Sequence, residues 1–85
     1  MKYKILFKES VEKDLRRIPK EKLKVIHRKI HKDIATNPFQ GKTLTEKWKE
    51  LRRLESYPFR IIYTILEIKK TVLITRIRHR KDVYK

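Results

Sequence analysis

The spacing of the apolar residues changes halfway along this chain, and the change limits the folds that the chain can adopt. In the first half, four leucine and isoleucine residues recur at intervals of three and four, which is the spacing of one face of an amphipathic helix. They are Leu23, Ile26, Ile30 and Ile34. From Phe59 onward, apolar residues instead alternate with other residues, as they do in half-buried strands. Helices followed by consecutive strands are typical of an α+β domain.

The first half is predicted to contain one strand and two helices. The strand runs from Tyr3 to Phe7. Ser10 is the predicted N-cap of the first helix, because a serine hydroxyl can accept a hydrogen bond from an N–H group of the first turn. Pro19 separates this helix from the second one, which carries the apolar stripe and ends before Asn37-Pro38.

The second half is predicted to contain three strands, which are Lys49 to Leu54, Phe59 to Glu67 and Val72 to Arg78. The loop that precedes them holds the single glycine, Gly41, where the backbone can require a positive φ. Short connections between successive strands favour antiparallel pairing. We therefore expect the order β-α-α-β-β-β, with the two N-terminal helices packed on one face of a small, mainly antiparallel sheet.

Length and composition predict one small soluble domain that spans residues 1–85. A chain of 85 residues has no room for a second core. The absence of cysteine excludes disulfides and thiolate–zinc sites, and it suits a reducing cytoplasm. The N-terminus has an apolar run of only three residues, which is too short for a signal peptide or a membrane span. We expect a cytoplasmic protein that does not bind membranes.

The charge of the chain predicts an anionic partner. Twenty-five lysines and arginines face ten aspartates and glutamates, which leaves a net charge of +15. Self-repulsion of this size weakens a small fold unless something anionic binds it. Nucleic acid is the first candidate and an acidic protein is the second.

Several arginines fall on the predicted strands. Arg53, Arg60 and Arg78 would form a cationic floor if the strand register brings them together, and guanidinium forks bind phosphate through two parallel hydrogen bonds. On the last strand, alternation predicts one shared face for Val72, Ile74, Arg76 and Arg78. The alternative for each arginine is solvation, or an ion pair with an acid such as Glu55.

The last ten residues, RIRHRKDVYK, favour chemistry on RNA. RNA can be cleaved without a metal if its 2′-hydroxyl is deprotonated, the phosphate is stabilised and the leaving 5′-oxygen is protonated. Arginines can stabilise the phosphate but are poor proton carriers. His79 is the only histidine in the basic strand segment, and its ordinary pKa suits neutral pH. Tyr84 is a second candidate base if cations depress its pKa, and its alternative is a packing residue.

Other residues are weaker candidates. His27 and His31 are four apart on a helix but lack a third ligand nearby in sequence, so we expect no metal and no cofactor. Trp48, Tyr57 and Phe59 can stack on bases, although aromatic residues at strand spacing belong more often to the core.

The whole chain resembles the RelE/ParE superfamily of toxin–antitoxin toxins. The resemblance lies in the FKESVEKDLRRIP opening, the NPFQGKTL loop, the LRRLESYPFRIIY segment and the closing HRKDVY. It covers Tyr3 to Tyr84 and implies the same β-α-α-β-β-β fold. It also implies a cytoplasmic toxin that a cognate antitoxin holds inactive in a hetero-oligomer. RelE-like members cut mRNA in the ribosomal A site without metal, whereas ParE-like members poison DNA gyrase.

The resemblance also implies the roles of individual residues. It places catalytic functions on Arg60, Arg78, His79, Arg80 and Tyr84. It places Arg53 at one of the family's basic positions, where we expect RNA binding. We expect Lys49, Arg76 and Lys81 to bind RNA as well, because they are further cations near the same strands. One departure is that some members carry two alternating lysines where this chain has Leu51 and Arg53. Proton transfer would then fall to His79 and Tyr84.

Three functions are compatible with these features of the chain. The four residues Arg60, Arg78, Arg80 and Tyr84 favour a ribosome-dependent endoribonuclease, because they are those that phosphate stabilisation needs. The second function is inhibition of DNA gyrase without nuclease activity. The third is a structural RNA-binding protein that neither cuts RNA nor arrests growth.

Overall fold

The computed structural model describes residues 2–44 and 50–81. Its first part contains β1 (Lys4–Phe7), α1 (Glu9–Arg16) and α2 (Lys20–Arg28), which continues as the π-helical segment η1 (Lys29–Ile34). A short 3₁₀ turn, η2 (Pro38–Gln40), leads to β2 (Lys42–Thr43). The second part contains β3 (Leu51–Ser56), β4 (Phe59–Leu66), η4 (Glu67–Lys69) and β5 (Thr71–His79). Among the described residues, no helix is long and apolar enough to cross a membrane.

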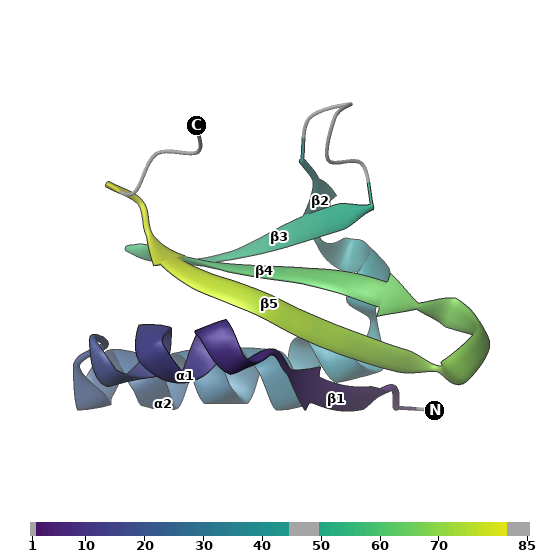
Figure 1. The fold of residues 1–85 in the computed structure, drawn as a ribbon, viewed down its shortest axis with the longest axis horizontal. Coiled ribbons are helices and arrows are strands. Elements are labelled where there is room, and N and C mark those ends of the chain that lie inside the picture. Colours follow the sequence, from purple (N-terminus) through teal and green to yellow (C-terminus); the bar gives the residue numbers. More distant parts are fainter. Residues whose placement is uncertain (1, 45–49, 82–85) are drawn as a thin grey trace.

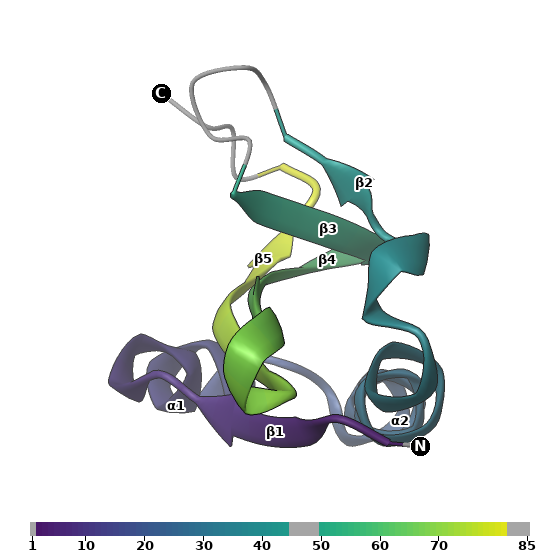
Figure 2. The ribbon, with the colours of Figure 1, turned by 90° about the vertical axis from the view of Figure 1, so that its right-hand side faces the viewer.

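The strands form one five-stranded sheet in the order β1-β5-β4-β3-β2. β1 is parallel to β5, and the other neighbours are antiparallel. Both helices lie on the same side of β3, β4 and β5, and in the described part of the chain the other side of these strands carries no helix (Figure 1; Figure 2). The predicted α+β fold is therefore confirmed, with the short strand β2 as an addition.

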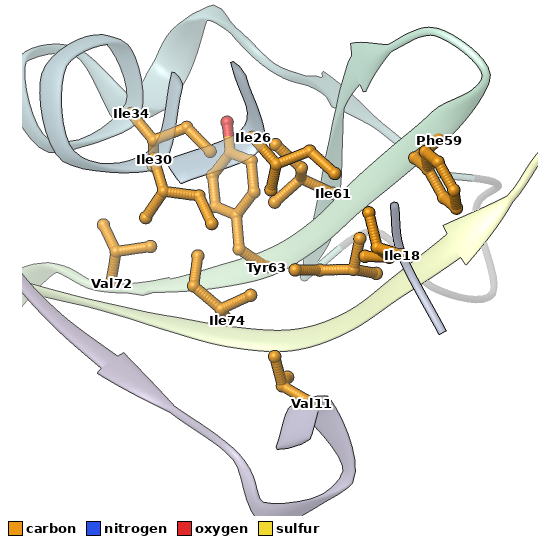
Figure 3. Close-up of a cluster of buried hydrophobic side chains, with 11 residues drawn as sticks. Val11, Ile18, Ile26, Ile30, Ile34, Phe59, Ile61, Tyr63, Val72 and Ile74 are labelled. Carbon is orange, nitrogen blue, oxygen red and sulfur yellow. The ribbon is translucent and has the colours of Figure 1, made fainter. Parts of the chain in front are cut away.

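The predicted helical stripe forms the helix side of the core. Ile26, Ile30 and Ile34 are almost completely buried, and they pack on residues of β4 and β5 such as Tyr63 and Ile74 (Figure 3). Val11 of α1 closes the other side of this cluster. Burying these side chains stabilises the fold through the hydrophobic effect, by about 1.5–3 kcal/mol for each large aliphatic residue.

Gly41 is needed for close packing and not for a special backbone conformation. Its φ is −71°, so the expected positive φ is wrong. A Cβ at this position would lie 2.9 Å from the Arg53 carbonyl oxygen and would collide with the Tyr63 hydroxyl. That hydroxyl is buried and donates a hydrogen bond to the Pro38 carbonyl. Glycine therefore lets the loop approach the sheet closely enough for β2 to pair with β3.

The predicted N-cap of the first helix is wrong. α1 begins at Glu9, and Lys8 is its N-cap residue. Ser10 lies inside the first turn, and its hydroxyl donates a 2.9 Å hydrogen bond to the Thr75 carbonyl of β5. β1 pairs with β5 only as far as Ile74, so the carbonyl of Thr75 lies on a free strand edge and needs another donor.

The predicted face of the last strand is also wrong, because β5 contains an irregularity. Ile62 is opposite Arg76 and Tyr63 is opposite Ile74, so Thr75 falls between two paired positions. Such a bulge shifts the alternation by one residue. Ile77 consequently joins the core beyond the bulge, although it is an odd number of residues from the equally buried Ile74.

Candidate nucleic-acid interface

Three arginines lie together on the side of the sheet opposite the helices. Arg60 of β4 is directly opposite Arg78 of β5, and Arg53 of β3 is opposite Ile62, two residues along β4 from Arg60. Directly opposite residues of antiparallel strands have Cβ atoms about 5 Å apart. We call Arg53, Arg60 and Arg78 the cationic cluster. The register thus brings together the three arginines that the sequence could only place on strands.

One carboxylate lies within the cationic cluster. The Glu55 Oε1 atom is 3.2 Å from Nε of Arg60 and 3.8 Å from Nε of Arg53. The Arg60 Nε atom is buried, and no described residue accepts a hydrogen bond from it. Its contact with Glu55 is therefore an ion pair without a hydrogen bond. Glu55 therefore neutralises part of the cluster's charge, as the ion-pair alternative from the sequence had anticipated.

Arg76 is bound to α1. Its guanidinium donates two 2.9 Å hydrogen bonds to the two carboxylate oxygens of Asp14, which is a bidentate pair. The buried Asp14 carboxylate also accepts a 2.9 Å hydrogen bond from the Ile77 backbone N–H. The predicted RNA-binding role of Arg76 thus falls on a side chain that already joins α1 to β5.

His79 lies on the opposite side of β5 from Arg78, next to the core. Its ring makes an edge contact with Phe59, with the two ring centroids 5.3 Å apart. The Nδ1 atom accepts a 3.1 Å hydrogen bond from the Lys81 backbone N–H. This bond favours the neutral tautomer that carries its proton on Nε2. The structure therefore separates His79 from the cationic cluster by the thickness of one strand.

Arg80 is held by the turn between β3 and β4. Its backbone N–H donates a 2.7 Å hydrogen bond to the Pro58 carbonyl, and its Nη1 atom donates a 3.2 Å bond to the Tyr57 hydroxyl. The guanidinium carbon also lies 5.3 Å from the centre of the Tyr57 ring. Tyr57 is 69% exposed, so it is available for stacking, whereas Phe59 belongs to the core.

The remaining predicted residues are exposed or fall outside the described part of the chain. Lys81 is exposed just beyond β5. Lys49, Trp48 and Tyr84 lie outside the described residues. Arg52, which follows Leu51 on β3, does not join the cluster, because its Nη1 atom donates a 2.8 Å hydrogen bond to the Gly41 carbonyl.

Next to His79 lies a cleft that could not be found from the sequence. It has a volume of about 520 Å³ and lies between the turn that joins α1 to α2 and the ends of the sheet strands. Its lining includes Arg17, Lys22, Pro58, Arg78 and His79. No local spacing rule connects residues 17–22 with residues 58 and 78–79, because the contact exists only once the helices pack on the sheet.

The two helical histidines, His27 and His31, lie side by side. Their ring centroids are 4.3 Å apart, and His31 also lies near the ring of Phe7. Burial lowers the pKa of His31, and the neighbouring His27 and Lys2 lower it further. The described residues contain no group of three or more side chains that could hold a metal ion.

Comparisons with known proteins cover nearly the whole chain. A family model described as "ParE toxin of type II toxin-antitoxin system, parDE" matches residues 5–84. The chain is similar to a chain of the RelBE2 toxin–antitoxin complex of Mycobacterium tuberculosis, with 25% identity, a TM-score of 0.88, and coverage of 94% of this chain and 100% of that chain. No curated protein sequence matches it.

Two further solved structures share the fold at lower identity. A chain of the RelB–RelE complex from Methanococcus jannaschii is 23% identical, with a TM-score of 0.73, and the match covers 93% of this chain and 94% of that chain. The isolated RelE toxin of E. coli is 16% identical, with a TM-score of 0.75, and the match covers 91% of this chain and 83% of that chain.

Proposed function

The chain belongs to the ParE toxin family of type II toxin–antitoxin systems, within the RelE/ParE superfamily, and from its arginines we propose that it is a ribosome-dependent endoribonuclease. Its partners are then mRNA on the ribosome, in the cytoplasm, and a cognate antitoxin that blocks it. Complexes of toxin with antitoxin among the similar structures support the antitoxin as partner.

The pairing of Arg60 with Arg78 carries this proposal. The two residues are directly opposite each other on neighbouring strands. Their sequence neighbours Ile61 and Ile77 point into the core, so both arginines lie on the side of the sheet opposite the helices. When a 2′-oxygen attacks the adjacent phosphorus, negative charge develops on the phosphate oxygens of the transition state. Two guanidinium forks at this distance can hold those oxygens through charge-assisted hydrogen bonds. Arg53 lies beside them, where it can bind a neighbouring phosphate.

The cleavage also needs two proton transfers, which we assign to His79 and Tyr84. Because the His79 ring lies on the other side of β5 from Arg78, it must reach the RNA around the end of that strand, from the cleft that it lines. One of these residues takes the proton of the 2′-hydroxyl, and the other protonates the 5′-oxygen that leaves. The products are a 2′,3′-cyclic phosphate and a 5′-hydroxyl, so no water or other reactant is consumed. An imidazole ring has one nitrogen that can accept a proton and one that can donate it, which suits either role. Arg80, Arg76, Lys81 and Lys49 would position the RNA.

The decisive experiment is translation in a purified system with the protein added, followed by primer extension on the mRNA. We expect cuts on translated message only, and we expect Arg60→Ala and Arg78→Ala each to remove them. Removal of a single transition-state donor typically lowers a rate about 10²–10³-fold. Arg28→Ala is the matched control, since it removes one exposed arginine of α2 that is distant in sequence from the site. If the wild-type protein inhibits growth but leaves translated mRNA uncut, the proposal is wrong.

Inhibition of DNA gyrase is the second candidate, and the description of the matching family model favours it. A gyrase poison would leave mRNA intact, would inhibit supercoiling and would cause cleaved DNA to accumulate. Both assays on one preparation therefore separate the two functions. Loss of growth inhibition in Arg60→Ala, with a normal thermal unfolding curve, would show that the cationic cluster acts in the cell.

A further inference from the structure

The cleft between the α1–α2 turn and the end of the sheet carries an excess of positive charge. Arg17, Lys22, Arg76 and Arg78 line it, and among the described lining residues only Asp14 carries a carboxylate. That carboxylate is already bound by Arg76 and by a backbone N–H group. Within residues 2–44 and 50–81, Arg17 and Lys22 form no ion pair, and both are exposed. The cleft therefore suits an anionic ligand.

The N-terminus of α2 adds to this preference. Pro19 is the N-cap residue and lines the cleft, and no side chain of the described residues makes a capping hydrogen bond there. The first N–H groups of a helix have no partner within the helix, and they give this end a partial positive charge. Together with the side chains of Arg17 and Lys22, they favour a phosphate at the mouth of the cleft.

The floor of the cleft is apolar. Pro58, Phe59 and Ile77 form it, with Phe59 and Ile77 only 7% and 3% exposed. The ring of His79 stands beside them, in contact with Phe59. A phosphate alone needs no apolar floor, and the volume of about 520 Å³ is that of a site for a small organic molecule. A nucleotide matches both parts, because it joins an anionic phosphate to a flat aromatic base.

Arg78 connects the cleft to the cationic cluster, because it lies opposite Arg60 and also lines the cleft. We propose that the cleft binds one nucleotide of the RNA substrate, next to the phosphate that is held by Arg60 and Arg78. The phosphate of the bound nucleotide contacts Arg17 and Lys22, and its base lies over the apolar floor. This inference rests on the proposed nuclease function and adds a subsite to it.

The test measures binding of a short fluorescent RNA with 2′-O-methyl groups, which cannot be cleaved, to the full chain at fixed salt. We expect Arg17→Ala/Lys22→Ala to weaken binding at least 10-fold. We expect the control Arg28→Ala/Lys32→Ala, which removes the same charge from exposed positions of α2 and η1, to change it less than 3-fold. Equal losses in both double variants would overturn the subsite, because only net charge would then matter.

A second measurement tests the base. In NMR titrations of the full chain, guanosine monophosphate should shift the backbone amides of Phe59 and Ile77, whereas inorganic phosphate should shift only those near Arg17 and Lys22. If neither nucleotide nor RNA binds the cleft, but an acidic antitoxin peptide loses affinity for Arg17→Ala/Lys22→Ala, the cleft is a protein site and the inference is wrong.

Failure of the subsite and failure of the nuclease function give different results. Binding is measured on RNA that cannot react, so the result does not depend on catalysis. A wild-type chain that binds RNA through the cleft but leaves translated mRNA uncut would support the subsite and overturn the nuclease. If Arg17→Ala/Lys22→Ala cuts mRNA as well as the wild-type chain and binds RNA with the same affinity, the nuclease function is supported and the subsite is overturned.

Discussion

At the scale of single residues, Glu55 is a carboxylate among the arginines of the cationic cluster. It forms ion pairs with Arg53 and Arg60, and its side chain is 56% exposed. An exposed ion pair contributes little to the stability of a fold. The carboxylate nevertheless lowers the positive potential that the cationic cluster presents to an incoming phosphate.

We predict that Glu55→Gln tightens RNA binding about 3–10-fold, because it removes a negative charge that repels a nearby phosphate by about 1 kcal/mol in a largely aqueous environment. Fluorescence anisotropy with uncleavable RNA measures the effect. Glu12→Gln is the matched control, because it makes the same change of charge on the exposed side of α1. If Glu55→Gln binds RNA no more tightly than the wild-type chain, Glu55 does not oppose RNA binding at the cationic cluster.

His31 makes stability depend on pH. Its folded-state pKa is lowered by burial first, and then by His27 and Lys2. Between that lowered pKa and the ordinary value of about 6.5, the unfolded chain binds more protons than the folded chain. The contribution of His31 to stability is therefore complete above about pH 6.5, and it is lost as the pH falls through the folded-state pKa.

We predict that the melting temperature of the wild-type chain falls more steeply between pH 7 and pH 5 than that of His31→Gln, which cannot titrate. Thermal unfolding followed by circular dichroism at several pH values provides the comparison. Parallel curves for the two proteins would show that the environment of His31 does not oppose its protonation.

At the scale of elements, α1 completes the edge of the sheet. β1 pairs with β5 only up to Ile74, and the next polar groups of β5 bind α1 side chains instead. The Ser10 hydroxyl donates to the Thr75 carbonyl, and the Asp14 carboxylate accepts from the Ile77 N–H. An unpaired buried backbone group costs free energy, so these contacts explain how β5 can extend beyond β1 toward Arg78 and His79.

We predict that Asp14→Ala lowers the free energy of unfolding by about 2–3 kcal/mol, because it leaves a backbone N–H unsatisfied and removes a charge-assisted pair. Chemical denaturation measures this loss. The control Glu12→Ala removes an exposed carboxylate from the same helix and should change stability by less than about 0.5 kcal/mol. Equal effects of the two substitutions would mean that helix charge, and not the edge contact, is responsible.

At the scale of the whole molecule, the net charge of +15 opposes folding and favours binding of RNA. Repulsion among like charges raises the free energy of the compact state, and dissolved salt screens it. Salt also weakens the attraction between the protein and phosphates, since the release of counterions on binding is then less favourable. Salt should therefore act in opposite directions on stability and on affinity.

We predict that raising NaCl from 50 to 500 mM increases the melting temperature of the free chain by several degrees, because the added ions screen the repulsion among its like charges. Over the same range it should weaken binding of uncleavable RNA by at least about 10³-fold. Thermal unfolding and fluorescence anisotropy give the two dependences. A melting temperature that falls with salt would show that specific ion pairs outweigh the general repulsion.

The sequence by itself determined the types and order of the main elements. The helical stripe of Ile26, Ile30 and Ile34 and the alternation along β4 are local periodicities, and hydrophobic burial makes each of them visible without knowledge of the partner. The same alternation also predicted that the arginines near the C-terminus lie on a strand. The N-cap and the role of Gly41 could not, because distant partners, Thr75 and Tyr63, decide both.

Only the tertiary structure decided how the site is assembled. The register that sets Arg60 against Arg78 and the bulge at Thr75 depend on hydrogen bonds between segments that are distant in the sequence. The cleft likewise joins Arg17 to His79 across most of the chain. A short pattern records which side chains prefer burial, but a one-residue shift in strand pairing reverses the side on which each side chain lies.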